Sequence, residues 1–595
     1  MSKRLKRVAV NVVSLVMALL LIMVQAGCGG NSTQSSATDT GTTTSTGASS
    51  TEPAKETPVT LKILFGFTMG AALNGVQTDP VAKEIEKQTG VIMDVMSGNA
   101  ITDLPGKIST LIATNDLPDL IYLGQSDLMA KAVSAKQLIP LDSLIEKGGQ
   151  NFKQNSTLML QFAKRFMSND KNGKSDGNTY LLPLGAGVVD YNAIKGNYMP
   201  SIRWDLYKKL GYPKAETLAD YVPIMQQLMK LEPTNKDGKK TYGMGAYFGD
   251  GQWAGDFQIW AGTSMYGQCP ADNFSMILKS LDDTSFSHYL TDKSSSFYKF
   301  LDFFNKANRA GVLDPDSFTM KQANYTEKMQ AGRYLFAALG SDSDGFNTTM
   351  LQQNITDKAF GRLPIPADST SALITWDIPQ GNASGGWAIS TNCKYPEKAM
   401  KLLDYLASYD GVETIYNGVK GVNWDMVNGK PAMNQATLDG LIKNPDYSIT
   451  SGVAKYSQWP FLSGMSKDPR YDTFMNLRNE PDALVSQLTA IDKEQCAYYN
   501  IKLPIELVTG KFKTVQQYTP EQAFMSKLPK DLQDKANKID LYYFNNYLKM
   551  VLAKTDAEYA AEQDKFIKGV NDLGYETVVS WYNTERDRVL PTLKK

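Results

Sequence analysis

Strand and helix patterns alternate in the stretch that follows the polar N-terminal region, and this alternation constrains the fold more than any other feature. Residues 59–65 (VTLKILF) alternate in polarity as a strand does, and residues 91–96 (VIMDVM) and 120–123 (LIYL) are further strand-like runs. Between the last two runs, apolar residues recur at helical spacing over 104–114. Strands separated by helices of this length predict βαβ crossovers and a mainly parallel sheet, so we expect an α/β fold.

The first helix has clear signals at both ends. Asp79 suits the N-cap, Pro80 suits the first helical position, and Gly90 suits the C-terminal end. From Asp482 onward the chain is mostly helical in pattern. Other amphipathic helical patterns run over 204–210, 217–231, 296–310 and 395–408.

The N-terminus has the three zones of an export signal. Residues 1–7 are basic, residues 8–24 are almost wholly apolar, and two small residues precede Cys28. This order predicts a cleavable signal peptide over residues 1–27. The sequence VQAGC (24–28) resembles the lipobox of bacterial lipoproteins, in which the cysteine is diacylated and becomes the mature N-terminus. Gln25 departs from that motif, where an apolar residue is usual, and an uncleaved anchor helix is the alternative interpretation.

A flexible linker is expected between the signal and the body. Residues 28–57 are mainly Ser, Thr and Gly, which cannot bury enough apolar surface to offset the entropy of ordering. The remaining body, residues 58–595, is long for one domain and suits two lobes. We expect two acyl chains on Cys28 to hold the protein on the outer face of the cell membrane, in a cell of the Gram-positive type.

Charge and cysteine content exclude several classes of protein. Removing residues 1–27 deletes four positive and no negative charges, which leaves 58 positive against 62 negative residues and a net charge of −4. The body has no basic run, so we expect no nucleic-acid partner. Cys269, Cys393 and Cys496 are far apart with no CxxC pair, which argues against zinc and leaves one disulfide or three free thiols open.

Several local patterns of the body, each weak alone, occur in the order and spacing of a known family. Through them the body resembles the extracellular solute-binding proteins of ABC importers, in the family 1-like branch that binds sugars and oligosaccharides. The match extends over about residues 57–425. Its segments are DPVAKEIEKQTGV (79–91), KISTLIATNDLPDLI (107–121), QLIPLDSLI (137–145), DGNTYLLP (176–183), IRWDLYKKLGYP (202–213), ETLADY (216–221), and GGWAIS with YPEKAMKLLDYL (385–406).

The resemblance implies a two-lobed type II periplasmic-binding-protein fold with a helix-rich C-terminal part. Lobe 1 would comprise about 58–180 and a return segment around 335–400, and lobe 2 about 190–330 and the C-terminal helices. A saccharide, and within this branch an oligosaccharide, would stabilise a closed form that contacts it from both lobes. The protein, a monomer, would then deliver it to the permease subunits of the importer.

A sugar presents an apolar face and a rim of hydroxyl groups, so its site needs aromatic platforms with polar groups at their edges. The chain has 8 Trp and 30 Tyr, although large aromatics are also ordinary core residues. Trp204 suits the core, and Trp387 suits either role. The charged candidates have solvated loop charges as their alternative interpretation. The predicted ligand-binding residues are Trp253, Trp260, Trp376, Asp377, Asn423, Trp424, Arg203 and Asp342, with Asp344 as the alternative to Asp342.

Two loops resemble calcium-binding loops without completing one. Residues 169–178 place side-chain oxygens around a glycine but lack the bidentate Glu of a full EF-hand loop. Some relatives carry a calcium loop at the place of residues 232–241, where Asn235 and Asp237 remain here among several lysines. We expect no metal and no cofactor, with calcium bound at one of these loops as the alternative interpretation.

Two other functional classes stay open at this point. Carboxylates are plentiful, so a secreted carbohydrate-active enzyme, a glycoside hydrolase or lyase, is the main alternative. The only histidine, His288, has no G-x-S-x-G or H-E-x-x-H context, which excludes sites that need several histidines. A peptide- or lipid-binding surface protein on the same scaffold is the third class, and it would need a more apolar cleft.

Overall fold

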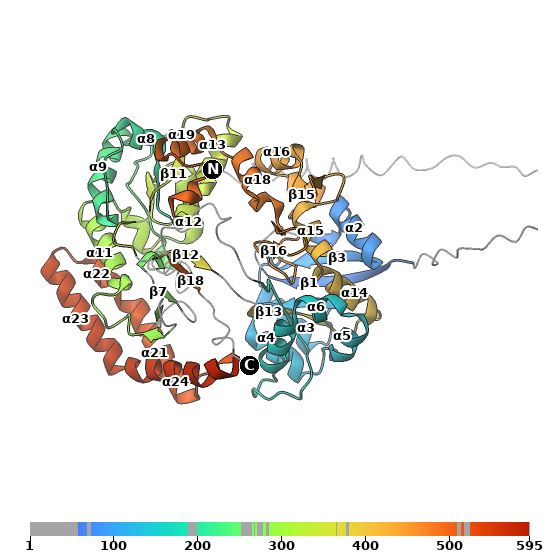
Figure 1. Cartoon of the computed structure of the whole chain (residues 1–595). Coiled ribbons are helices and arrows are strands. Elements are labelled where there is room, and N and C mark those ends of the chain that lie inside the picture. The colour runs from blue at the N-terminus through green and yellow to red at the C-terminus, as the bar shows by residue number, and fades with distance from the viewer. Residues whose placement is uncertain are drawn as a thin grey trace, which may run out of the picture. The chain divides into compact units, whose positions relative to one another are not determined.

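The first lobe is built on a six-stranded sheet with the order β2-β3-β1-β4-β13-β5 in the computed structural model (Figure 1). β1 (Val59–Gly66) pairs in parallel with β3 (Val91–Ser97) and β4 (Leu120–Leu123), as the alternating pattern predicts. The α/β fold class is therefore confirmed. The antiparallel neighbours are β2 (Asn74–Val76) on β3, β13 (Asn382–Ile389) on β4, and β5 (Leu182–Leu184) on β13.

Thr57–Lys595 forms one compact unit. The structure describes residues 57–67, 73–187, 199–250, 264–266, 268–270, 278–280, 285–364, 366–369, 371–375, 380–508, 513–516 and 524–593. Within these ranges, none of the helices has the length and apolar character needed to cross a membrane.

The helices of the first lobe begin with α2 (Pro80–Thr89), which has the predicted ends. Asp79 accepts a hydrogen bond from the backbone N–H of Ala82 at 2.9 Å, and Gly90 takes a φ of 72°. Asp79 also pairs with Lys455 Nζ at 2.8 Å, so the cap joins this helix to a distant part of the chain. The other helices of this lobe are α3 (Leu104–Ala113), α4 (Ser126–Ser134), α5 (Asp142–Gly148), α6 (Gln150–Asn155), α7 (Thr157–Phe162), α14 (Pro396–Leu406) and α15 (Tyr409–Asn417).

The second lobe has a short antiparallel sheet with β6 (Ser201–Arg203) between β10 (Phe336–Ala337) and β11 (Phe360–Arg362). Trp204 is fully buried in the core of this lobe, the role that its helical position favours. Its main helices are α8 (Trp204–Lys209), α9 (Tyr221–Leu231), α11 (Ser296–Arg309), α12 (Gln322–Gln330) and α13 (Asp344–Gln352). Short strand pairs are β7 (Gln268–Pro270) with β8 (Leu278–Ser280), β8 with β9 (Phe286–Ser287), and β12 (Ser371–Thr375) with β18 (Lys513–Gln516).

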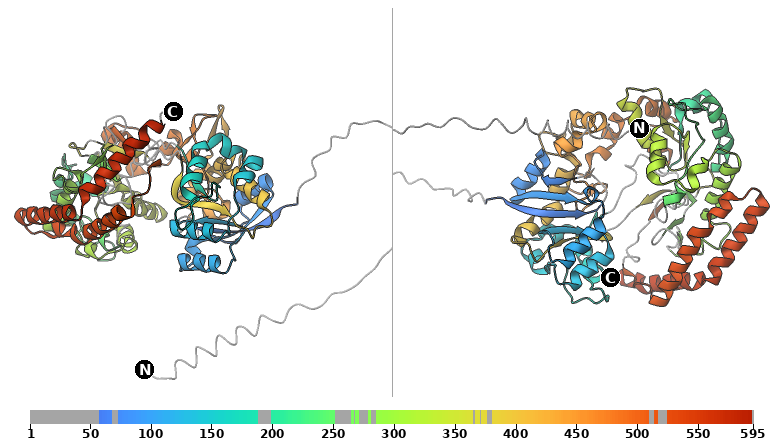
Figure 2. Two further views of the ribbon diagram at one scale, coloured as in Figure 1. Left: turned by 90° about the horizontal axis from the view of Figure 1, so that it is seen from below. Right: turned by 180° about the vertical axis from the view of Figure 1, so that it is seen from behind.

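The C-terminal part is helical and packs on the second lobe, as the sequence pattern predicts. Figures 1 and 2 show its last helices, in red, on the second lobe, and in Figure 1 α22 (Leu548–Leu552) lies beside α11. Asn305 of α11 lies in this contact and donates hydrogen bonds to the backbone oxygens of Met550, Val551 and Ala553 at 2.7–3.1 Å. The helices are α19 (Ala490–Tyr499), α21 (Lys530–Asn546), α22 (Leu548–Leu552), α23 (Asp556–Asp572) and α24 (Tyr575–Leu593).

The chain returns to the first lobe later than the expected 335. β10 and β11 pair with β6 in the second lobe, and the return begins at β13. β10 and β11 have only two and three residues, too short to show a periodicity in the sequence. After α15 come β14 (Trp424–Val427), β15 (Lys430–Met433), α16 (Gln435–Lys443), α17 (Tyr447–Ser451), β16 (Lys467–Asp468), β17 (Thr473–Phe474) and α18 (Pro481–Ser486).

Candidate functional site

The carboxyl ends of β1, β3 and β4 meet at one edge of the first-lobe sheet, because the three strands are parallel. The chain passes from β1 to β3 on one side and then to β4 on the other, so the strand order reverses between β1 and β4. Open α/β sheets bind ligands outside the carboxyl ends of their strands at such a point. We call this the carboxyl edge; it comprises residues 66–67, 97–98 and 123–124, with 185–187 and 380–382 at its β5 side.

Glycines at the carboxyl edge bring backbone segments close together. A Cβ atom on Gly66 would lie 2.3 Å from the carbonyl oxygen of Tyr122, and one on Gly124 would lie 2.7 Å from that of Gly66. A Cβ atom on Gly98 would lie 2.5 Å from the carbonyl oxygen of Phe67. A larger residue at any of these places would force the strand ends apart.

An aromatic cluster lies directly beneath this edge. The ring of Phe65 is 5.0 Å from that of Tyr122, 5.4 Å from Trp387 and 5.5 Å from Trp459, measured between centroids. These four residues are buried, which settles Trp387 as a core residue. Phe67 continues the cluster at 6.0 Å from Tyr122 but is partly exposed, so it is a ring that a ligand can reach.

Two buried side-chain oxygens at the β5 side have no hydrogen-bond partner in the part of the chain that the structure describes. They are Oε1 of Gln380, just before β13, and Oγ of Ser466. Ser466 lies against the carboxyl end of β5, since a Cβ atom on Gly187 would be 2.4 Å from its Oγ. An unsatisfied buried polar atom is costly, and a ligand hydroxyl or a water molecule could satisfy it.

Four of the predicted ligand residues, Trp253, Trp260, Trp376 and Asp377, lie outside the described residues. Trp376 and Asp377 stand just before Gln380 in the sequence, and that residue belongs to the carboxyl edge. Their assignment as ligand residues stays a prediction.

Arg203, another predicted residue, is held inside the second lobe. Its side chain is 1% exposed and donates hydrogen bonds to Asp205 at 2.8 Å and to Glu232 at 2.8 and 3.2 Å. The guanidinium group also lies 5.2 Å from the ring centre of Phe346. The two carboxylates raise the pKa of Arg203 despite its burial. These partners satisfy the guanidinium group without a ligand.

Asn423 and Trp424 are likewise buried and paired internally. Asn423 accepts a hydrogen bond from the backbone of Val419 at 3.0 Å and donates to Thr437 Oγ1 at 3.3 Å. Trp424 is 7% exposed, donates from Nε1 to the carbonyl oxygen of Gly418 at 3.0 Å, and packs in a small apolar cluster. In this structure both stabilise the turn before β14, and contact with a ligand stays a prediction.

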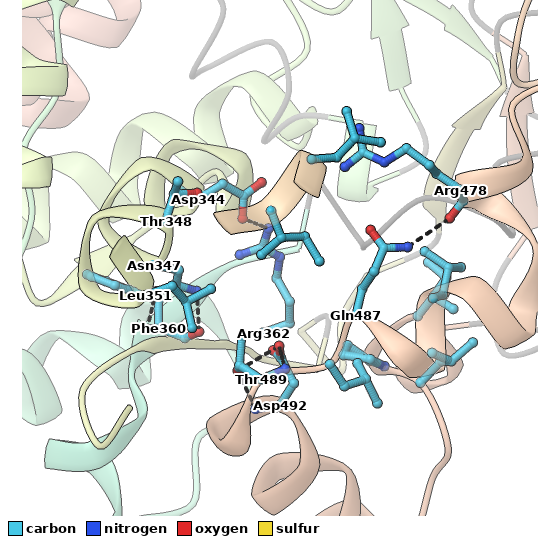
Figure 3. A pocket seen from close by; sticks show the side chains of 17 residues that line it. Asp344, Asn347, Thr348, Leu351, Phe360, Arg362, Arg478, Gln487, Thr489 and Asp492 are labelled. Atoms are coloured by element: carbon cyan, nitrogen blue, oxygen red, sulfur yellow. Dashed lines mark hydrogen bonds and ion pairs between the residues drawn. The ribbon is translucent and has the colours of Figure 1, made fainter. Parts of the chain in front are cut away.

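Of the two aspartate candidates, Asp344 is the first residue of α13, and Asp342 lies in the short 3-10 turn (Gly340–Ser343) that precedes it. Asp344 pairs with Arg362 Nη2 at 2.6 Å (Figure 3). Asp342 lies beside Tyr325, where burial first and this carboxylate second raise the pKa of the phenol. Both aspartates therefore interact with second-lobe residues in this structure.

The loops considered for calcium are closed by their own hydrogen bonds. Asp170 accepts from the backbone of Asn172 and Lys174 at 2.8 and 2.9 Å, and Asn235 accepts from that of Asp237 and Lys239 at 3.1 and 2.9 Å. Within the described ranges, no group of three or more His, Cys, Asp or Glu side chains could hold a metal. Among the cysteines, Cys393 and Cys496 are buried free thiols, so no disulfide joins them.

Residues 76–413, more than half of the sequence, match the family model of bacterial extracellular solute-binding proteins. The chain belongs to this family. The resemblance stated from the local patterns is thereby confirmed, and the carboxyl edge lies in the first lobe of a solute-binding protein. None of the curated proteins compared with the chain matches it.

Solved structures of solute-binding proteins share the fold. A substrate-binding protein of an ABC transporter from Streptococcus pneumoniae, an EF-hand mutant in complex with fructo-nystose, is 16% identical with a TM-score of 0.59 over 90% of this chain and 100% of its own. An alginate-binding protein without calcium is 18% identical with a TM-score of 0.56 over 90% and 99%. An HMO-binding protein of Bifidobacterium longum infantis is 15% identical with a TM-score of 0.53 over 90% and 99%.

Phe65, Phe67, Gln380 and Ser466 were not among the predicted ligand residues. In the sequence, Trp in polar surroundings indicates a ligand residue, whereas Phe67 directly follows an ordinary strand pattern. The parallel β1 and β4 alone could have pointed to Phe67, because it follows the carboxyl end of β1. No local signal marks Ser466, which reaches the edge only through the bridge between Ala186 and Leu462.

Proposed function

We propose that this protein captures a saccharide, an oligosaccharide by preference, outside the cytoplasm and delivers it to the permease subunits of an ABC importer. The observation that carries the proposal is the carboxyl edge of a solute-binding fold, where Phe67 is partly exposed and the side-chain oxygens of Gln380 and Ser466 have no hydrogen-bond partner among the described residues. An aromatic ring suits the apolar face of a sugar, and the oxygens can accept from its hydroxyl groups. The proteins of similar fold that bind fructo-nystose, alginate and HMO support a saccharide as the ligand class.

Closure of the two lobes is the proposed mechanism. A ligand at the carboxyl edge contacts the first lobe alone until the second lobe approaches, and it then contacts both. It therefore binds the closed form more tightly and shifts the population toward that form. The permease subunits would distinguish the loaded protein by this closed form.

The anchor is part of the same proposal. Cleavage before Cys28 and diacylation of its thiol would tether a monomeric body through the linker 29–57, beside its importer on the outer face of the membrane. Growth with labelled palmitate should label the whole chain, and Cys28→Ala should abolish the labelling. Equal labelling of the Ala variant would contradict the lipoprotein assignment.

Binding without turnover separates this proposal from the enzyme alternative. The mature chain from residue 29 would be screened against oligosaccharide pools by thermal shift and calorimetry, and each pool would be analysed for cleavage products. We expect stabilisation by one class of oligosaccharide and unchanged pools. Cleavage products would favour a carbohydrate-active enzyme, and stabilisation by peptides or lipids alone would move the protein to the third class.

A further inference from the structure

A hollow of about 250 Å³ shares no lining residue with the carboxyl edge. One wall consists of α13, β11, the start of α19 and residues 503–505, and the other consists of α16, Arg478 and α18. The segment 487–489, which leads from α18 into α19, lies along the hollow, which we call the α16–α19 pocket. Figure 3 shows the side chains that line this pocket.

The walls of the α16–α19 pocket combine aliphatic side chains with polar and charged ones in about equal number. Neither wall offers a ring comparable to Phe67, because Phe360 is 1% exposed. The aliphatic side chains bury methyl and methylene groups well. They include Leu351, Leu441, Ile442, Leu484, Leu488 and Leu503.

Both carboxylates of the pocket already have partners. Asp344 pairs with Arg362 at 2.6 Å, and Arg362 donates to Ser343 Oγ at 3.1 Å as well. Asp492 accepts from the N–H and the hydroxyl group of Thr489 at 2.9 and 2.8 Å, in the cap of α19. Neither carboxylate forms an ion pair with the other arginine of the pocket, Arg478.

Among the described residues that line the pocket, Arg478 is the cation without an anionic partner. No described residue forms a hydrogen bond or an ion pair with its guanidinium group, and burial lowers the pKa of Arg478 because no anion compensates the lost water. Its carbonyl oxygen accepts from Gln487 Nε2 at 3.3 Å, and the same amide nitrogen donates to Ala483 at 2.8 Å. Figure 3 shows Arg478 reaching across one side of the pocket, opposite Asp344 and Arg362.

We propose that the α16–α19 pocket binds a small organic carboxylate with a short branched aliphatic body. The carboxylate would pair with the fork of Arg478, which favours planar anions with two oxygens. The aliphatic body would fill the space between the leucines of the two walls. A bare inorganic anion would leave these walls unfilled, and a neutral amide would leave the cation unpaired.

Calorimetry of the mature chain with 3-methylbutanoate tests the proposal. We expect binding at millimolar concentration and at least tenfold weaker binding of 3-methylbutanamide and of inorganic phosphate, a difference of about 1.4 kcal/mol. Arg478→Met should weaken the binding of 3-methylbutanoate at least tenfold, whereas Arg478→Lys should retain part of the affinity. Arg333→Met is the matched control, since Arg333 lies outside the pocket and donates to the carbonyl oxygen of Lys240 at 3.1 Å.

A second variant tests the aliphatic part of the pocket without changing the charge of Arg478. Leu441→Trp should fill the pocket and abolish carboxylate binding while Arg478 remains in place, with circular dichroism confirming that the variant folds. Unchanged binding in Arg478→Met or in Leu441→Trp would overturn the proposal, as would no binding of 3-methylbutanoate by the wild type. Saccharide affinity should be equal in Arg478→Met and the wild type, because the carboxyl edge is a different site.

Discussion

Buried polar groups have hydrogen-bond partners around Arg203, whereas two of those at the carboxyl edge have none among the described residues. Arg203 is 1% exposed, and two carboxylates and the ring of Phe346 satisfy it. Gln380 and Ser466 are also buried, but their side-chain oxygens have no partner in the described part of the chain. A buried polar atom without a hydrogen-bond partner destabilises the fold, whereas one with partners does not. The cluster around Arg203 is therefore structural, and the oxygens of Gln380 and Ser466 are suited to binding a ligand.

The largest effect should come from breaking the satisfied cluster. Arg203→Met should lower the free energy of unfolding by about 3–5 kcal/mol, since it leaves the largely buried carboxylates of Asp205 and Glu232 without their counter-ion. Urea unfolding measures this loss, with Arg333→Met as the control. If stability held and saccharide affinity fell instead, Arg203 would be the ligand residue that the sequence predicted.

A third buried cluster, around Glu413, is only partly compensated, because one arginine serves several carboxylates. Glu413 is 3% exposed; burial raises its pKa to about 7, although Arg470, at 3.2 Å, acts in the opposite direction. Asp468, fully buried, and Asp410 face the same arginine and raise the pKa further. Glu413 is thus an acid that the fold prefers to keep protonated.

The folded pKa of Glu413 lies above its unfolded value, so its contribution to stability is present below about pH 4.5 and is lost as the pH rises through about 7. Between pH 5 and pH 8 the loss should reach about 2–3 kcal/mol. Glu413→Gln should flatten this dependence in urea unfolding, whereas Glu397→Gln, at an exposed position, should not. If the free energy of unfolding of Glu413→Gln kept the same pH dependence, a group other than Glu413 would be responsible for it.

The exposed ring at the carboxyl edge should affect binding more than stability. Phe67→Ala should weaken saccharide binding by about 1–3 kcal/mol in calorimetry, because it removes a stacking surface. Phe544→Ala, at another partly exposed phenylalanine, should leave the affinity unchanged. Equal affinity in both variants would place the sugar away from Phe67 and return attention to Trp253 and Trp376.

Calcium removal should have the smallest effect. In the loop after α9, the amide oxygen of Asn235 already accepts from two backbone N–H groups, and Lys239 brings a positive charge to the loop. EDTA or added calcium should therefore leave the melting temperature and the saccharide affinity unchanged. A calcium-dependent rise in melting temperature would show that residues 169–178 or 232–241 bind the ion.

The α/β class, the ends of α2 and the helical C-terminal part could be predicted, because each depends on short-range periodicity or on caps within a few residues. The short strands β10 and β11 could not, and their pairing with β6 moved the return segment to β13. Arg203 and Trp424 illustrate the same limit for the site. Their polar surroundings in the sequence are those of a ligand residue, yet Glu232 and Gly418 satisfy them in the fold.

The sequence by itself determined the alternation of strands and helices and the family patterns, and it predicts the export signal, since local hydrophobic period and residue order carry all three. Only the tertiary structure decided which polar groups remain without partners among the described residues. Gln380 and Ser466 are 86 positions apart in the sequence and reach the same β5 side of the sheet through β13 and the segment after Leu462. Hydrogen-bond satisfaction is a property of neighbours in space, and periodicity along the chain does not encode it.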